Sequence, residues 1–123
     1  MMLPPYGLCL PVKCRRIVDG DTIVVAFAGS EREWTVRLLD CWAPERNTIE
    51  GQAAKLFAQR VIDEAADELS LFIPAPADAA HPLDLFTFGR ILAHVFVGTE
   101  DTLSEIMVRA GHATKEKQPR AAQ

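Results

Sequence analysis

Strand-type alternation on both sides of an Asp-Gly-Asp turn is the feature that most restricts the folds available to this chain. In VKCRRIVDGDTIVVAF, residues 12–27, apolar and polar residues alternate before the turn, and a run of β-branched residues follows it. Period-two alternation is typical of strands, and Asp-Gly supplies the left-handed backbone of a tight turn. The segment therefore predicts two antiparallel strands joined at residues 19–21.

Three further segments have strand composition, and two other segments have helical periodicity. EWTVRLL (33–39), LSLFIP (69–74) and RILAHVFV (90–97) are rich in the residues that strands favour. Apolar residues return with helical period over 52–66, which predicts a surface helix. Six residues are expected on the buried face of this helix: Ala54, Phe57, Ala58, Val61, Ile62 and Ala65.

The second helix is expected to begin at Thr102, which can form a capping box with the glutamate three positions later, and to end at Gly111. Three strands, a helix, two strands and a helix indicate an α+β fold. The five strands are expected to close into a small Greek-key β-barrel, as in an OB-fold. The expected domain covers residues 12–114, between an N-terminal extension, 1–11, and a flexible tail, 115–123.

Composition sets limits on partners and location. The formal net charge of −4 gives no global attraction to nucleic acid, so phosphate binding requires a local group of Arg and Lys. No apolar run approaches the ~20 residues that cross a bilayer, and no basic segment precedes the first apolar residues. These features predict a cytoplasmic protein. Cys9, Cys14 and Cys41 lack metal-site spacing and are expected to be reduced and mostly buried.

Several residues in these segments carry groups that bind cations or phosphates. Asp21 presents a carboxylate of the kind that Ca²⁺ prefers, although the Asp-Gly-Asp motif is also an ordinary turn. Arg37 and Arg90 could grip one phosphate together, or each could pair with a nearby carboxylate. Glu45 follows the stiff Pro44, and is either a general base toward water or an ordinary loop acid.

The order of these motifs resembles that of the thermonuclease, or staphylococcal-nuclease-like, family of OB-fold domains. The motifs are IVDGDTIVV, VRLL, APE, GQAAKLFAQRVI, FGRILAHVFV and LSEIMVRAGHA, and they cover roughly residues 12–114. Each motif alone is common. Their occurrence together, in this order and at compatible distances, is much more specific.

The resemblance implies a metal-dependent nuclease that hydrolyses phosphodiester bonds of DNA or RNA. In such an enzyme Asp21 would bind Ca²⁺ or another divalent cation, and Glu45 would position or deprotonate the attacking water. The substrate contacts that the resemblance implies are Arg37 and Arg90, at the scissile phosphate, together with Thr22 and Phe88.

Trp42 departs from the family pattern. It stands two residues before Pro44, where the family has a metal-binding aspartate, and an indole offers no oxygen to a hard cation. Asp40 is a candidate surrogate ligand, but two residues along a strand displace its Cα by about 7 Å, so that it needs a bulge to take this role. Weak metal binding is therefore expected.

Two functions remain open. A nuclease with a modified metal site is the leading hypothesis, because Asp21, Arg37, Glu45 and Arg90 are all retained. The alternative is a non-catalytic OB-fold module that binds nucleic acid or protein, and Trp42 favours it. Cleavage assays with EDTA and with added calcium would separate the two.

Overall fold

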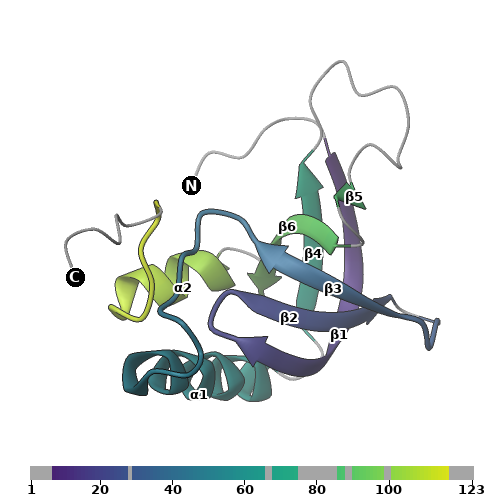
Figure 1. Ribbon diagram of the computed structural model, residues 1–123. Coiled ribbons are helices and arrows are strands. Elements are labelled where there is room, and N and C mark those ends of the chain that lie inside the picture. The colour runs from purple at the N-terminus through teal and green to yellow at the C-terminus, as the bar shows by residue number, and fades with distance from the viewer. Residues whose placement is uncertain are drawn as a thin grey trace.

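Five strands close into a mixed β-barrel that two helices accompany (Figure 1), which confirms the expected α+β barrel fold. This count applies to the part of the chain that the computed structural model describes. The helices are α1 (Ile49–Ala65), which lies across one end of the barrel, and α2 (Leu103–Arg109), which packs against α1 and β6. The described residues are 7–27, 29–65, 68–74, 86–87, 90–98 and 101–116.

The barrel wall consists of β1 (Gly7–Asp19), β2 (Thr22–Phe27), β3 (Glu33–Leu38), β4 (Leu69–Pro74) and β6 (Arg90–Val97). Neighbours pair antiparallel in the order β3, β2, β1, β4, β6, and a parallel pairing of β3 with β6 closes the barrel. Two short strands, β5 (Phe86–Thr87) and β7 (Asp101–Thr102), also pair with β6. They were not expected, because two residues are too few to show a period.

Strand β1 begins at Gly7, upstream of the start expected at Val12. Residues 7–11 pair with β4, and most of the remaining strand pairs with β2, so that β1 belongs to both sides of the barrel. The sequence does not indicate a strand over residues 7–11, because the segment contains Pro11, and proline has no backbone donor and is rare inside strands. Residues 7–11, which were expected to belong to an extension, therefore contribute to the barrel wall.

Helix α1 buries its small residues most completely. Ala54, Ala58 and Ile62 are buried, whereas Phe57 and Val61 are half-buried at the edge of the core. The predicted face is therefore the one that packs on the barrel. The helix starts at Ile49, three residues earlier than expected, because the Thr48 hydroxyl accepts a hydrogen bond from the backbone N–H of Gly51 at 2.9 Å and caps the first turn.

Replacing Phe57 with alanine should lower the free energy of unfolding by about 2 kcal/mol, less than the ~3–5 kcal/mol typical of a fully buried phenylalanine. The ring is half-buried, and its centroid lies 4.6 Å from that of the His112 ring. Urea denaturation measures the change. Leu56→Ala is the control, because Leu56 is exposed on the same helix and should change stability by less than about 0.5 kcal/mol. Equal effects of the two substitutions would contradict this packing.

Helix α2 has both of the caps that its sequence predicts. The Thr102 hydroxyl accepts from the Glu105 N–H at 3.1 Å, and the Glu105 carboxylate accepts from the Thr102 N–H at 3.2 Å. At the other end Gly111 has φ of 82°, and its N–H donates to the Val108 carbonyl at 3.0 Å. Neither helix in the described ranges has the length and apolar character needed to cross a membrane.

The three cysteines differ in burial. Cys9 is exposed, Cys14 is half-buried and Cys41 is buried, and none forms a disulfide. The expectation of mostly buried cysteines is therefore met in full only for Cys41. Burial raises the pKa of Cys14 to about 11 and that of Cys41 to about 12, so these two thiols stay protonated at neutral pH.

Candidate functional site

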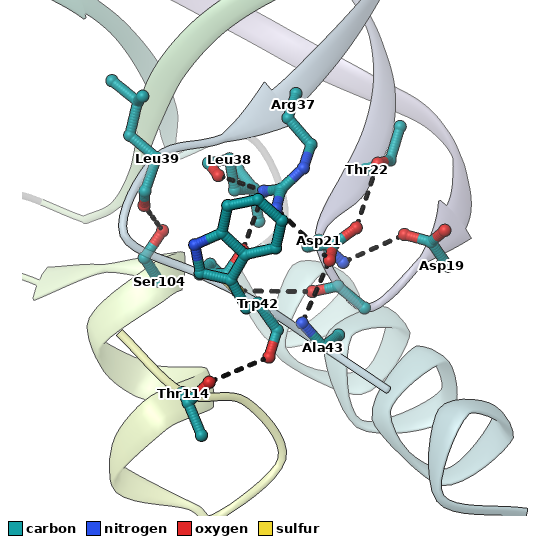
Figure 2. Close-up of polar contacts among 12 residues, drawn as sticks. Asp19, Asp21, Thr22, Arg37, Leu38, Leu39, Trp42, Ala43, Ser104 and Thr114 are labelled. Atoms are coloured by element: carbon teal, nitrogen blue, oxygen red, sulfur yellow. Dashed lines mark hydrogen bonds and ion pairs between the residues drawn. The ribbon is translucent and has the colours of Figure 1, made fainter. Parts of the chain in front are cut away.

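The Asp21 carboxylate lies where the β1–β2 turn meets the segment that follows β3 (Figure 2). Its Oδ2 atom accepts a hydrogen bond from the Ala43 backbone N–H at 3.0 Å, and its Oδ1 atom accepts one from the Thr22 hydroxyl at 3.1 Å. The Nη2 atom of Arg37 lies 3.6 Å from Oδ2. Both charged side chains are 14% exposed, so this ion pair is largely removed from water.

The turn that carries Asp21 is held by hydrogen bonds on both sides. Asp19 Oδ1 accepts from the Asp21 N–H at 3.1 Å, and the Asp21 carbonyl accepts from the Leu38 N–H at 2.9 Å. Gly20 permits close packing here, because a Cβ at this position would stand 2.7 Å from the Ala43 Cβ. The Asp-Gly-Asp motif is therefore an ordinary turn and also the source of the site carboxylate.

Burial raises the pKa of Asp21 to about 6. The Asp19 carboxyl group adds to this increase, whereas the Ala43 N–H and the Arg37 guanidinium oppose it by favouring the charged form. Desolvation thus outweighs the ion pair. The carboxylate is ionised at neutral pH, and it takes up a proton in mildly acidic solution.

Arg37 is bound to the chain that surrounds it. Its Nη1 atom donates to the carbonyl oxygens of Leu38 and Cys41, the second at 2.7 Å. Its guanidinium carbon lies 4.5 Å from the centroid of the Trp42 ring, within range of a cation–π interaction. Arg37 therefore combines two backbone contacts, an ion pair and an aromatic contact (Figure 2).

Trp42 covers Arg37 and remains 40% exposed. Its backbone is held by the C-terminal segment, because its N–H donates to the Thr114 carbonyl at 2.8 Å and its carbonyl accepts from the Thr114 N–H at 3.0 Å. The Ser104 hydroxyl donates to the Leu39 carbonyl at 2.6 Å and fixes the same segment from α2. The indole position is thus set by backbone contacts as well as by Arg37.

Asp40 lies beside His94 of β6. It has φ of 55°, in the left-handed region, and its Oδ2 atom lies 3.9 Å from Nε2 of the buried His94. Burial lowers the pKa of His94, which keeps the imidazole neutral at pH 7. The left-handed residue changes the chain direction after β3, and the Asp40 carboxylate faces His94. Its role as a surrogate metal ligand stays a prediction.

The donors around Asp21 do not fit a calcium ion well. Calcium takes six to eight oxygen ligands, with carboxylates prominent among them. Here Oδ2 of Asp21 already contacts an N–H and a guanidinium, and the neighbouring side chain, Trp42, has no oxygen to offer. Among the described residues, no three His, Cys, Asp or Glu side chains are arranged to hold a metal ion.

Of the other expected site residues, Glu45 and Arg90 are described and both are exposed. Glu45 is exposed, two residues after Ala43, and its carbonyl accepts from the Thr48 N–H at 3.0 Å. Arg90 is exposed at the start of β6, and its Cα partner on β3 is Thr35. Phe88 lies outside the described residues, as do residues 117–123 of the expected tail.

The sequence did not predict two of the contacts at this site. Ser104 and Thr114 lie 65 and 72 positions from the residues that they hold, and no local pattern connects them. Asp19 could have been recognised, because an aspartate at the start of a turn often accepts a hydrogen bond from the backbone two residues later.

No protein-family model matches this chain, and no curated protein matches it in sequence.

Proposed function

We propose that this chain is a nucleic-acid-binding barrel of the thermonuclease-like type, which holds DNA or RNA without metal-dependent cleavage. The observation that carries the proposal is the Trp42 indole lying on the Arg37 guanidinium, 4.5 Å from centroid to carbon, beside the Asp21 carboxylate. Aromatic rings stack on bases, and the Trp42 ring, held in place by Arg37, is 40% exposed, so the ring is suited to contact with nucleic acid. Trp42 also stands where the resemblance places a metal ligand.

The test measures binding and cleavage separately. Fluorescence anisotropy of a labelled 20-nucleotide dT strand in EDTA reports binding, and a gel of the same strand after incubation with Ca²⁺, Mg²⁺ or Mn²⁺ reports cleavage. The proposal expects binding and no cleavage above that of a buffer control. Cleavage that EDTA abolishes would overturn it, as would the absence of binding.

A second candidate function is hydrolysis of the phosphodiester bond. The largely buried Asp21–Arg37 ion pair favours it, because arginine beside a carboxylate of raised pKa is common in catalytic sites. Glu45, in the adjoining segment, would act on the attacking water. This candidate requires the cation that the present donors fit poorly.

Trp42→Asp should raise the affinity for Ca²⁺ by roughly tenfold, equivalent to about 1.4 kcal/mol. The substitution adds a carboxylate near Asp21 and removes the ring that covers Arg37. The backbone bridge between Trp42 and Thr114 does not require the indole. Calorimetric titration with Ca²⁺ measures the affinity.

Trp42→Leu is the control for this experiment, since it removes the indole without adding an oxygen. Its calcium affinity should equal that of the natural protein, and both variants should be checked by thermal melting in the same buffer. A folded Trp42→Asp protein whose calcium affinity stays at the level of Trp42→Leu would show that position 42 does not face a cation site.

A further inference from the structure

The outward side of helix α1 carries apolar residues that the fold leaves exposed. Ile49 is 86% exposed and Leu56 is 69% exposed, more than any other large hydrophobic residue that the structure describes. Ala53, which lies between them, is also exposed. Steps of four and then three residues place these side chains along one side of a helix, and the three residues form the α1 stripe. A continuous row of exposed apolar side chains indicates a contact surface, because its burial is favourable.

The α1 stripe lies on the side of the helix opposite the core. The residues that α1 buries are Gly51, Ala54, Ala58 and Ile62. At about 100° per residue, their mean direction is about half a turn from that of the stripe. The helix packs mainly against β1 and α2, and it forms the lower edge of the molecule in Figure 1. The stripe therefore faces away from the barrel.

Four exposed charged residues accompany the stripe, and their signs alternate. In chain order they are Arg46, Glu50, Arg60 and Glu64. The first lies just before α1, and the other three lie on the helix within about a quarter turn of one another. Glu50 and Arg60 are each five positions from residue 55. Arg46 and Glu64 are each nine positions from it, so opposite charges stand at equal distances on its two sides.

An antiparallel second copy of α1 matches this order of charges. With a twofold axis at residue 55, Glu50 of each copy stands level with Arg60 of the other. Arg46 likewise stands level with Glu64 of the other copy. Opposite charges across an interface fix its register, whereas like charges disfavour it. A parallel twofold pair would place each charge beside its own equivalent, so the charges favour the antiparallel arrangement.

The same axis brings the apolar residues together. Leu56 lies one position after residue 55 and Ala53 lies two positions before it, so Leu56 of each copy would pack beside Ala53 of the other. Ile49 lies six positions from the axis and Arg60 lies five, so Ile49 would pack on the methylene groups of the opposite Arg60. Charge register and apolar contact thus agree on one arrangement of two identical chains.

We propose that α1 is a self-association surface, through which two copies of this chain form an antiparallel dimer with twofold symmetry. A helix of 17 residues is about 26 Å long, so its contact buries less than the ~1,600 Å² of a standard interface. The dimer is therefore weak, with a Kd of about 100 µM. A lipid surface fits the stripe less well, because anionic headgroups would repel the glutamates beside it. The inference goes beyond the nucleic-acid binding proposed above and does not depend on it.

Sedimentation equilibrium of the full chain measures the association from about 10 µM to about 1 mM, a range that brackets the expected Kd. The natural protein should change from mostly monomer to mostly dimer across this range. Leu56→Gln should weaken dimerisation by about tenfold or more, since it places an amide at the centre of the apolar contact. Leu56 is exposed, so this variant should remain folded, which thermal melting by circular dichroism checks.

Charge reversal tests the antiparallel order. Glu50→Lys should weaken dimerisation about tenfold, because each copy then opposes Arg60 of the other with a like charge. Adding Arg60→Glu should return the Kd to within about threefold of the natural value. The two positions are about 15 Å apart on one helix, too far to pair within a copy, so this rescue requires a second copy. Glu31→Lys is the matched control, because Glu31 is exposed between β2 and β3 and its replacement changes the net charge equally. It should leave the Kd unchanged.

A natural protein that stays monomeric at about 1 mM would overturn the proposal. Association that Leu56→Gln and charge reversal leave unaltered would also overturn it, because the contact would then lie on another surface. Failure of the double variant to recover would rule out the antiparallel order. Binding of a monomeric protein to phosphatidylglycerol vesicles, lost in Leu56→Gln, would assign the α1 stripe to lipid instead. None of these results involves the Asp21 site, so the proposed nucleic-acid binding is tested separately.

Discussion

Replacing Gly51 with alanine is expected to destabilise the protein by about 3 kcal/mol, although alanine stabilises most helices by about 1 kcal/mol relative to glycine. A Cβ at position 51 would overlap the Glu45 carbonyl oxygen and stand 2.9 Å from the Arg46 Cα. Both are backbone atoms, which cannot move aside as a flexible side chain can. The segment that carries Glu45 must therefore shift away from α1.

Urea denaturation of Gly51→Ala, followed by far-ultraviolet circular dichroism, measures this loss. Ala53→Gly provides the comparison, because Ala53 is exposed in the same helix and its replacement should cost only the helix propensity of about 1 kcal/mol. A Gly51→Ala protein as stable as the natural one would show that α1 and the Glu45 segment are not in contact. Reduced nucleic-acid binding in a variant that remains folded would indicate that the segment helps to form the site.

Asp21→Asn is expected to stabilise the protein by about 2 kcal/mol at pH 7.5 and to have little effect near pH 4. Burial is the main cause of the raised pKa of about 6, so ionisation of this carboxyl group opposes folding. Asparagine has nearly the same shape and remains neutral. It therefore avoids the cost of a largely buried charge at neutral pH.

The sign follows from proton binding in the folded and unfolded states. The folded pKa of Asp21 lies above its ordinary value of about 4, so the folded protein binds more protons between these values. The contribution of Asp21 to stability is complete below about pH 4, and it is lost as the pH rises through about 6. Asp21→Asn removes this dependence, because asparagine does not titrate.

Denaturation of both proteins at pH 4, 6 and 7.5 gives the difference in unfolding free energy at each pH. Asp101→Asn is the control, since Asp101 also pairs with an arginine but is half exposed, and its replacement should change stability by less than about 0.5 kcal/mol. If the difference in unfolding free energy between Asp21→Asn and the natural protein is the same at every pH, the Asp21 carboxyl group is not held in a desolvated position.

The sequence alone was sufficient for the architecture and for the position of the central carboxylate. Each barrel strand has a local pattern that survives in the fold, except for the first part of β1 before Val12. The capping residues of α2 were equally clear, because Thr102, Glu105 and Gly111 act on backbone groups a few positions away. Local interactions of this kind depend on spacing along the chain, which a sequence displays directly.

Only the tertiary structure decided how the site residues are used. Arg37 binds nearby carbonyl groups, and Asp40 lies toward His94. Both arrangements depend on the chain direction after β3 and on the contacts of the following segment with α2 and Thr114. The sequence pattern placed Gly51 just before a helix. It could not show that the backbone of Glu45 lies against Gly51. These arrangements arise from segments distant in sequence, whose proximity is set by barrel closure and core packing and is not encoded in local residue spacing.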